Sequence, residues 1–332
     1  MRSSEELKHR KSKTQELRAA LAARGLAPRK SLGQNFMLDP NFAAFVARAA
    51  APDERTLLIE VGPGTGLLTT ALLQAHPAAR VLAIEIDRGL AALLRETLAQ
   101  ELAHGRLTLL EGDALSGKHA LSPALAQAAL EISARENRPR LVLCSNLPYN
   151  AATPFLMNLA CDSGKMALES AVATVQAELA ERLLARPGSS AYGAPTVILA
   201  LRATGRILRR VGKEIFWPRP DVDSAVIELR LKPWADSGDM TRFPAGFRGH
   251  DPDFQTAGNR VMSPESLLLR AEVAPFQKFL QWHFSQRRKM LRATFRPLEI
   301  PKALNIPPRA RVEELAPETL LALFRLTPQP RP

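Results

Sequence analysis

The chain has 332 residues, and its 45 Lys and Arg against 33 Asp and Glu give a formal net charge of +12. This length is enough for two domains, and a hydrophobic fraction of 46% excludes a globally disordered protein. The two cysteines are too few for a disulfide scaffold, and no apolar run approaches the roughly 18 residues of a membrane span. We therefore expect a cytoplasmic protein without a membrane partner, whose positive charge favours nucleic acid as a ligand.

The positive charge is concentrated in three segments. Residues 1–30 hold nine Lys and Arg against three Glu, which is half of the excess. The segment 202–219 has six basic residues against Glu214 alone, and a third cluster has no acid: Arg287, Arg288, Lys289, Arg292 and Arg296. Solvated faces could account for any one cluster, but three on an otherwise balanced chain predict a basic surface.

Strand and helix patterns alternate from residue 41 onwards. The predicted strands are 56–61, 80–86, 106–110, 140–144 and 168–175, and the predicted helices are 41–51, 67–75, 88–103 and 178–185. Continuous apolar strands separated by helices indicate an α/β fold with a parallel sheet that is covered on both faces.

The second half of the chain is less regular. After a loop at 187–195 we predict a helix at 196–203 and two late strands, 207–211 and 222–231, which could pair antiparallel. Residues 233–264 have the composition of a linker or inserted loop, and the apolar spacing then predicts helices at 275–295 and 317–324.

A glycine turn follows the first strand, at Gly62, Gly64 and Gly66. Glycines let the backbone turn tightly and let a ligand approach closely. Glu85 ends the second strand, where a carboxylate can accept hydrogen bonds from both hydroxyls of a ribose, and Asp113 follows the third, where it could accept one from an adenine amine. The combination predicts an adenosine-containing ligand, either S-adenosylmethionine or a nicotinamide dinucleotide.

The loop Asn146-Leu147-Pro148-Tyr149 follows the fourth strand, at the same end of the predicted sheet. The Asn146 side-chain carbonyl and a nearby backbone carbonyl could accept both hydrogens of an adenine amine, which favours its nucleophilic, pyramidal geometry. Pro148 restricts the turn, and Tyr149 offers a face on which an extruded base could stack. Alone such a loop is more often a simple turn, but after an intact glycine loop it predicts catalysis at an adenine.

Nine stretches, in this order, give the chain a specific resemblance to one family. They are 30–36 (KSLGQNF), 60–66 (EVGPGTG), 85–87 (EID), 112–114 (GDA), 146–150 (NLPYN), 176–182 (QAELAER), 191–193 (AYG), 217–226 (WPRPDVDSAV) and 284–292 (FSQRRKMLR). The chain resembles the KsgA/RsmA family of ribosomal RNA adenine dimethyltransferases.

The resemblance implies a Rossmann-like class I methyltransferase sheet, mostly parallel with an antiparallel late strand, and a small all-helical C-terminal domain. The expected parts are a basic extension (1–27), the methyltransferase domain (28–232), the linker (233–264) and the C-terminal RNA-binding domain (265–332). The implied reaction is dimethylation of N6 on two adjacent adenosines in the 3′-terminal hairpin of small-subunit (16S) rRNA, with S-adenosylmethionine as methyl donor. We expect a monomer that acts on a pre-assembled small ribosomal subunit.

The same resemblance implies roles for individual residues. The implied catalytic residues are Asn146, Leu147, Pro148 and Tyr149. The implied cofactor-binding residues are Gln34, Asn35, Met37, Gly62, Gly64, Glu85, Asp113 and Asn146. The implied RNA-binding residues are Arg287, Arg288, Lys289 and Arg292, on a C-terminal helix. No metal site is expected.

Three other functions remain open from the sequence. A large-subunit rRNA adenine methyltransferase of the antibiotic-resistance type would carry similar motifs. A non-catalytic nucleic-acid-binding relative, such as a mitochondrial transcription factor, could keep the fold. A nicotinamide oxidoreductase fits the sheet but leaves the basic clusters without a use.

Overall fold

The computed structural model describes residues 14–117, 120–161, 166, 168–232, 234, 268–295 and 304–326. Residues 1–13 of the predicted extension and the predicted linker, apart from Trp234, lie outside this part. The chain divides into two compact units, residues 1–180 with 205–230 and residues 181–204 with 231–332. The boundaries inferred from the sequence stay a prediction, and the division differs from them in placing 181–204 with the C-terminal residues. Among the described residues no helix has the length and apolarity to cross a bilayer.

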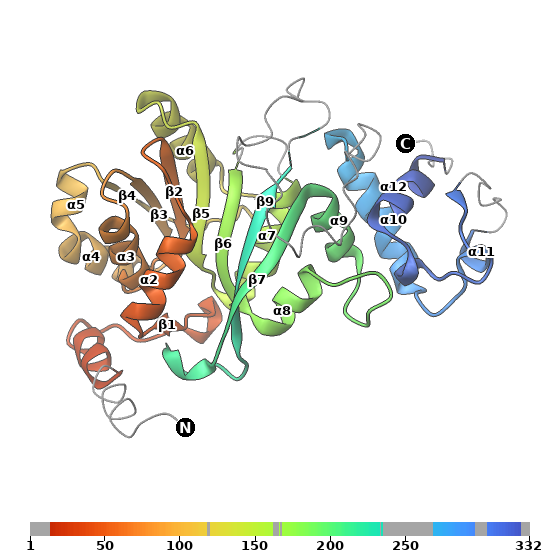
Figure 1. Cartoon of the computed structure of the whole chain (residues 1–332). Coiled ribbons are helices and arrows are strands. Elements are labelled where there is room, and N and C mark those ends of the chain that lie inside the picture. The colour runs from red at the N-terminus through yellow and green to blue at the C-terminus, as the bar shows by residue number, and fades with distance from the viewer. Residues whose placement is uncertain are drawn as a thin grey trace. The chain divides into compact units, whose positions relative to one another are not determined.

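The main sheet has seven strands in the order β4-β3-β2-β5-β6-β9-β7 (Figure 1). Strands β2 to β6 form parallel pairs, and β9 pairs antiparallel with β6. The strands are β2 (Thr56–Val61), β3 (Arg80–Glu85), β4 (Leu107–Glu111), β5 (Arg140–Asn146), β6 (Leu168–Gln176), β7 (Ala203–Val211) and β9 (Ser224–Leu231). The predicted mostly parallel sheet with an antiparallel late strand is confirmed.

Helices cover the sheet on both faces. They are α2 (Pro40–Ala49), α3 (Leu67–Ala75), α4 (Arg88–Thr97), α5 (Ala99–Ala103), α6 (Pro123–Arg135), α7 (Tyr149–Cys161) and α8 (Ala177–Leu183). The predicted single helix 88–103 is wrong, because it is interrupted at Leu98. Helices α6 and α7 were not predicted.

The core explains why β2 is mostly apolar, with Thr56 and Glu60 as its polar residues. Every residue of β2 is buried. Leu58 packs with α2 and α3 in one buried cluster, which also contains Val81 of β3 and Val142 of β5. Residues on either side of Leu58 point to the opposite face, where α6 lies against β2, β3 and β5. A strand covered on both faces needs apolar residues at odd and even positions alike.

A second, two-stranded sheet joins distant parts of the first unit. Strand β1 (Phe36–Met37) pairs antiparallel with β8 (Phe216–Trp217), and Leu38 N donates to Ile215 O at 2.8 Å. The short 3-10 helices η1 (Lys30–Leu32) and η2 (Lys213–Ile215) precede these strands. This pairing was not predicted, and it fixes the segment before α2 against the sheet.

The second unit contains the helices α9 (Ala194–Arg202), α10 (Val273–Ser285), α11 (Leu291–Thr294) and α12 (Pro317–Leu326). Its aromatic core includes Phe276, which lies 5.1 Å from Phe324 between ring centroids, and His283, which lies 4.7 Å from Phe295. The predicted continuous helix 275–295 is wrong. The chain leaves α10 after Ser285, and Met290 forms an isolated antiparallel bridge with Arg311 before α11 begins.

Candidate active site

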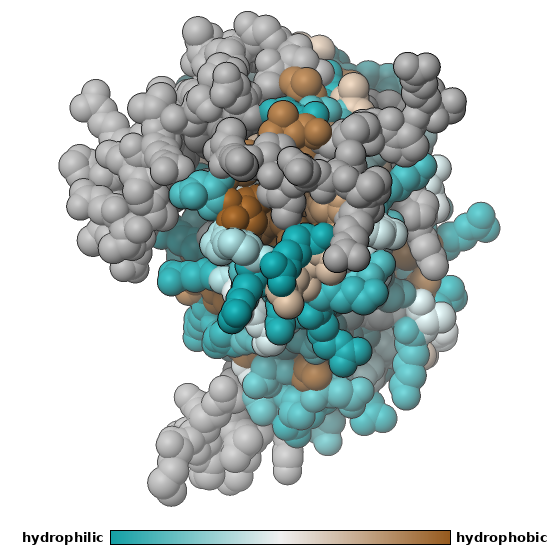
Figure 2. All heavy atoms as spheres, turned by 90° about the vertical axis from the view of Figure 1, so that its right-hand side faces the viewer, coloured by the Kyte–Doolittle hydropathy of each residue, from teal (hydrophilic) through white to brown (hydrophobic). Residues whose placement is uncertain are grey.

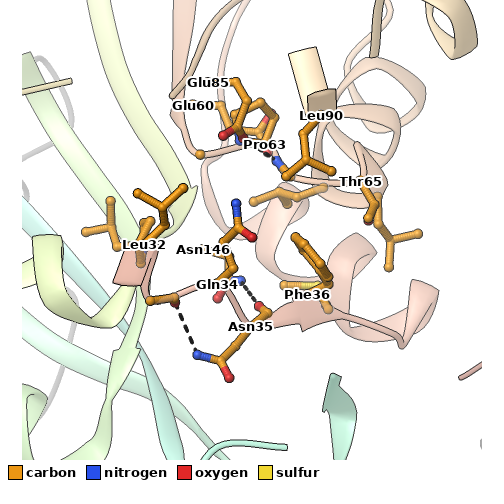
Figure 3. A pocket seen from close by; sticks show the side chains of 18 of the residues that line it. Leu32, Gln34, Asn35, Phe36, Glu60, Pro63, Thr65, Glu85, Leu90 and Asn146 are labelled. Atoms are coloured by element: carbon orange, nitrogen blue, oxygen red, sulfur yellow. Dashed lines mark hydrogen bonds between the residues drawn. The ribbon is translucent and has the colours of Figure 1, made fainter. Parts of the chain in front are cut away.

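A pocket opens at the carboxyl ends of β2, β3 and β5 (Figure 3). From β2 the chain continues to β3 on one side of it, and it later returns to form β5 on the other side, so the strand order reverses at β2. In open α/β sheets this point is where ligands bind. Every predicted catalytic and cofactor-binding residue except Asp113 lines the pocket. The lining comes from four parts of the chain: residues 32–37, the end of β2 with the glycine turn and the start of α3, the end of β3 with Leu90 of α4, and the loop after β5.

The glycine turn brings backbone close to the loop after β5. Gly62 and Gly64 have φ of 66° and 60°, a left-handed conformation that side chains disfavour. A Cβ atom on Gly62 would lie 3.2 Å from Pro148 Cγ, and one on Gly64 would lie 3.1 Å from the Phe36 ring. Both positions therefore require glycine for backbone conformation and for space.

Ser145 joins β2 to β5 just below these two loops. The backbone pairing of the strands runs only from Thr56 with Arg140 to Ile59 with Leu143. Beyond it, the Ser145 hydroxyl accepts from Val61 N at 2.7 Å and donates to Val61 O at 2.8 Å. The side chain thus satisfies two backbone groups where the strands separate.

Two buried carboxylates lie at one end of the pocket, from neighbouring strands (Figure 3). Glu85 accepts from Gly64 N at 3.0 Å and from Asp87 N at 2.9 Å, and burial raises its pKa. Glu60 Oε2 has no hydrogen-bond partner, and burial, with the nearby charge of Glu85, raises the pKa of Glu60 to about 8. The glycine turn is therefore held by Glu85, while Glu60 favours the protonated form at neutral pH.

Asn146 places a free acceptor in the pocket. Its Nδ2 donates to Asn35 O at 3.1 Å, which fixes the orientation of the amide. Its Oδ1 is buried and has no hydrogen-bond partner. Since an unsatisfied buried carbonyl is costly, this atom is well suited to accept a hydrogen bond from a ligand.

Tyr149 begins α7 at the rim of the pocket. Its hydroxyl and the Ser224 hydroxyl of β9 lie 2.7 Å apart, and burial raises the pKa of Tyr149. Leu147, between Asn146 and Pro148, is 1% exposed. The loop is therefore anchored to the core by Leu147 and to the sheet by the tyrosine hydroxyl.

Residues 30–37 cover the pocket from the side opposite the sheet. Asn150 Nδ2 donates to Ser31 O at 2.9 Å, in the same way that Asn146 holds Asn35. Gln34 Nε2 lies 3.5 Å from Asp87 Oδ2, and Met37 is buried in the core cluster of α2 and α3. This segment links the loop after β5 to the turn after β3.

Asp113 does not reach this pocket. It follows β4, its side chain is exposed, and its Oδ1 accepts from Leu115 N at 2.9 Å. Its role toward an adenine amine stays a prediction.

The predicted basic surface is only partly exposed. Arg202 is 3% exposed and its guanidinium lies 3.6 Å from the centroid of the Trp234 ring, so its place in the basic surface was wrong. Arg287 donates to Glu313 at 2.6 Å and to Ser190 O. The predicted helix for this cluster was also wrong: Arg287, Arg288 and Lys289 lie in the turn after α10, and Arg292 lies in α11.

Several residues of the site were not recognised from the sequence, among them Glu60, Ser145 and Phe36. Each lies within or beside a motif that the sequence displays. A charged residue at an inward position of an apolar strand is a signal that could have identified Glu60. The contacts of Ser145 and Phe36 depend on distant residues, and no local pattern indicates them.

The fold and the site define a class I methyltransferase. Two solved structures share the fold: a dimethyladenosine transferase from Plasmodium falciparum, with a TM-score of 0.60 and 21% identity over 87% of this chain and 95% of that one, and the 23S rRNA methyltransferase ErmE, with a TM-score of 0.56 and 21% identity over 88% and 98%.

The chain belongs to the ribosomal RNA adenine dimethylase family, whose model matches residues 25–244. It is 41% identical over 214 residues to the ribosomal RNA small subunit methyltransferase A of Leifsonia xyli, covering 64% of this chain and 69% of that protein. It is 32% identical over 315 residues to the protein of the same name from Bifidobacterium adolescentis, covering 93% and 92%. The chain is therefore an enzyme, an rRNA adenine methyltransferase by family.

Proposed function

We propose that the chain dimethylates N6 of two adjacent adenosines in the 3′-terminal hairpin of small-subunit (16S) rRNA, with S-adenosylmethionine as methyl donor. The observation that carries this proposal is the buried Oδ1 of Asn146, free to accept a hydrogen bond in a pocket formed by the family's motifs. The full-length similarity to small-subunit methyltransferases supports the choice of subunit. We propose a monomer in the cytoplasm and a pre-assembled small subunit as the substrate.

The residues of the pocket fit S-adenosylmethionine. The left-handed Gly62 and Gly64 leave room for close approach of its methionine part, and the buried Glu85 carboxylate suits a ribose diol. Gln34, Asn35 and Met37 would cover it. When bound, the cofactor supplies an electrophilic methyl group on a sulfonium.

The task of the protein is to hold the adenine amine, a poor nucleophile because its lone pair is delocalised into the ring. Asn146 Oδ1 accepts one amine hydrogen, and a backbone carbonyl of the loop accepts the other. Both bonds become stronger as positive charge develops on the nitrogen, so they favour the transition state over the ground state. The amide cannot rotate away, because its Nδ2 is bonded to Asn35 O.

The remainder of the loop positions the base. Tyr149 presents its ring at the rim while its hydroxyl is bonded to Ser224, so the ring has a fixed orientation for stacking. The cofactor, held by Gln34, Asn35, Gly62 and Glu85, would supply its methyl group directly to this nitrogen without a covalent intermediate on the enzyme. Its sulfonium would leave as the neutral thioether of S-adenosylhomocysteine, and one amine proton would pass to water.

A basic surface in the second unit would contact the RNA. Hydrophilic residues cover much of the described surface in Figure 2, with a few apolar side chains between them. The bridge between Met290 and Arg311 brings two further cations to the predicted cluster. Within the described residues, these exposed side chains make no ion pair: Arg288, Lys289, Arg292, Arg309 and Arg311. Cations without an ion pair need not give up a protein carboxylate in order to bind phosphates.

The test combines one substitution with two measurements. Asn146→Ala should lower the rate of methyl transfer to unmodified small subunits by about 100-fold or more, the usual effect of losing one transition-state hydrogen bond. Its affinity for S-adenosylhomocysteine should change less than about threefold. Mapping of the modified bases should place label on two adjacent adenosines near the 3′ end of the small-subunit RNA.

Asn150→Ala is the matched control. Asn150 makes the same kind of amide contact to the covering segment, but it does not line the pocket, so most activity should remain. Full activity of Asn146→Ala would contradict the assigned role. Label on the large subunit, or no label, would contradict the proposed reaction.

A further inference from the structure

Residues 14–29 fold back onto the first unit and are called the N-terminal arm. Residues 14–22 are helical, and the chain then turns through Gly25, with Leu26 N donating to Leu21 O at 2.9 Å. Nothing in the proposed reaction requires this arm.

The arm buries one apolar face against two residues of the pocket. Leu21 is 1% exposed and forms a buried cluster with Phe36 and Leu90, both of which line the pocket. Leu17 and Leu26 pack on the same cluster. The arm therefore supports the pocket lining from behind.

Phe36 is the link between the arm and the glycine turn. Its ring lies against Gly64, 3.1 Å from the position of a Cβ atom there, while Leu21 packs with Phe36 in the same cluster. The Phe36 and Trp217 rings are 6.2 Å apart, and the Arg18 guanidinium lies 5.9 Å from the Trp217 centroid. Displacement of the arm would remove the support that holds Phe36 over the turn.

Leu26 docks at the beginning of α4 in a space that a side chain would fill. A Cβ atom on Gly89 would lie 2.2 Å from Leu26 Cδ2. Gly89 has no positive φ, so the constraint on a side chain here comes from the packed Leu26, which would have to shift.

Polar contacts connect the arm to the turn after β3. Arg29 Nε lies 3.3 Å from the buried carboxylate of Asp87, and Arg29 N donates to Gln34 Oε1 at 2.8 Å. Asp87 also caps α4 by accepting from Gly89 N. The exposed pair of Arg24 and Glu96 contributes little.

We propose that the N-terminal arm is a positioning element for the cofactor, which holds Phe36 and Leu90 in the shape that binds it. This inference rests on the proposed use of S-adenosylmethionine and adds residues that do not touch the ligand. The arm should act on cofactor affinity, because docking of the arm and binding of the ligand both favour the same arrangement of Phe36. It should leave the chemical step unchanged.

The test measures binding of S-adenosylhomocysteine by calorimetry to the full chain and to Leu21→Ala. If the substitution leaves the arm docked in about one molecule in ten, the apparent Kd rises about tenfold, since only that fraction binds. With saturating cofactor, kcat and the KM for small subunits should stay within about twofold of the unaltered chain. Hydrogen exchange of residues 34–38 should become faster in the absence of ligand.

Leu125→Ala is the matched control, because Leu125 is equally buried but lies on α6 and does not line the pocket. It should lower the Tm without changing the Kd. Gly89→Ala is a second variant for the case that Leu21→Ala does not fold, since alanine favours the helix but displaces Leu26. It should raise the Kd without lowering the Tm.

The outcomes separate this inference from the proposed function. An unaltered chain that binds S-adenosylhomocysteine, with Leu21→Ala and Gly89→Ala binding equally well, would overturn the role of the arm alone. An unaltered chain that does not bind the ligand would overturn both. Tight binding without methyl transfer would overturn the proposed reaction and leave the arm's effect on the Kd intact.

Discussion

Glu60 should cost the protein stability at neutral pH. The side chain is 1% exposed, its Oε2 has no hydrogen-bond partner, and Glu85 lies on the neighbouring strand. Burial raises the pKa of Glu60 from 4.5 to about 8. Replacement by glutamine keeps the size of the side chain and removes the titration.

The direction of the change in stability follows from the pKa of Glu60 in the unfolded and the folded state. An acid whose pKa is higher in the folded state favours folding while it is protonated, and this advantage is lost as the pH rises from about 4.5 to about 8. Each pH unit is worth about 1.4 kcal/mol, so the loss is about 3 kcal/mol at pH 7 and about 5 kcal/mol above pH 8. Glu60→Gln should therefore be more stable than the unaltered chain by about 3 kcal/mol at pH 7 and by almost nothing at pH 4.5.

The assay is thermal unfolding of both proteins between pH 4.5 and pH 8.5. A gain of about 3 kcal/mol corresponds to a Tm higher by roughly 6 to 12 °C at pH 7 for a unit of this size. Glu54→Gln is the control, because it makes the same chemical change at an exposed position. A difference in Tm between Glu60→Gln and the unaltered chain that is equal at pH 5 and pH 8 would contradict the raised pKa of Glu60. A lower Tm of Glu60→Gln at pH 7 would contradict it as well.

Three further predictions concern the pocket, the RNA and the second unit. Gly62→Ala places a Cβ 3.2 Å from Pro148 Cγ at a φ of 66°, so it should weaken S-adenosylhomocysteine binding in calorimetry by at least about tenfold; unchanged affinity would contradict the close approach. Neutralising Arg288 and Lys289 should reduce the slope of log Kd for small subunits against log salt by roughly one to two, and an equal slope would place the RNA surface elsewhere. Burial lowers the pKa of His283 from 6.5 to about 4, so in unfolding measurements the unaltered chain should lose about 3 kcal/mol relative to His283→Phe as the pH falls from 6.5 to 4. Above pH 6.5 this difference between the two proteins should stay constant.

Elements whose burial follows a local pattern were predicted well. Strand β2 and helix α3 have the predicted bounds, because a strand buried on both faces and a helix after a glycine turn are each encoded by adjacent residues. Helix α6 was missed although Ser122 caps it and Pro123 begins it. Alanines lie on both of its faces and Leu130 is exposed, so the apolar pattern shows little contrast between the faces.

The features that the sequence could not indicate are those formed by contacts between distant residues. The predicted helix 275–295 has suitable apolar spacing, but pairing of Met290 with Arg311 interrupts it. Strands β1 and β8 have two residues each, which is too short to show an alternating apolar pattern. Each is a strand because it pairs with the other. At the site, the loop residues and Glu85 were identified from their motifs, whereas the support of Phe36 by Leu21 needed the structure.

The Ser145 hydroxyl has a consequence for how this enzyme can change. By occupying one donor and one acceptor of Val61, it sets how far the strands part above it, and so the width of the cleft between the glycine turn and Asn146. Part of this width is therefore set by a side chain of the sheet. Under the proposed reaction, substitutions in the surrounding loops would change which nucleotide enters and would leave this bond between the strands in place.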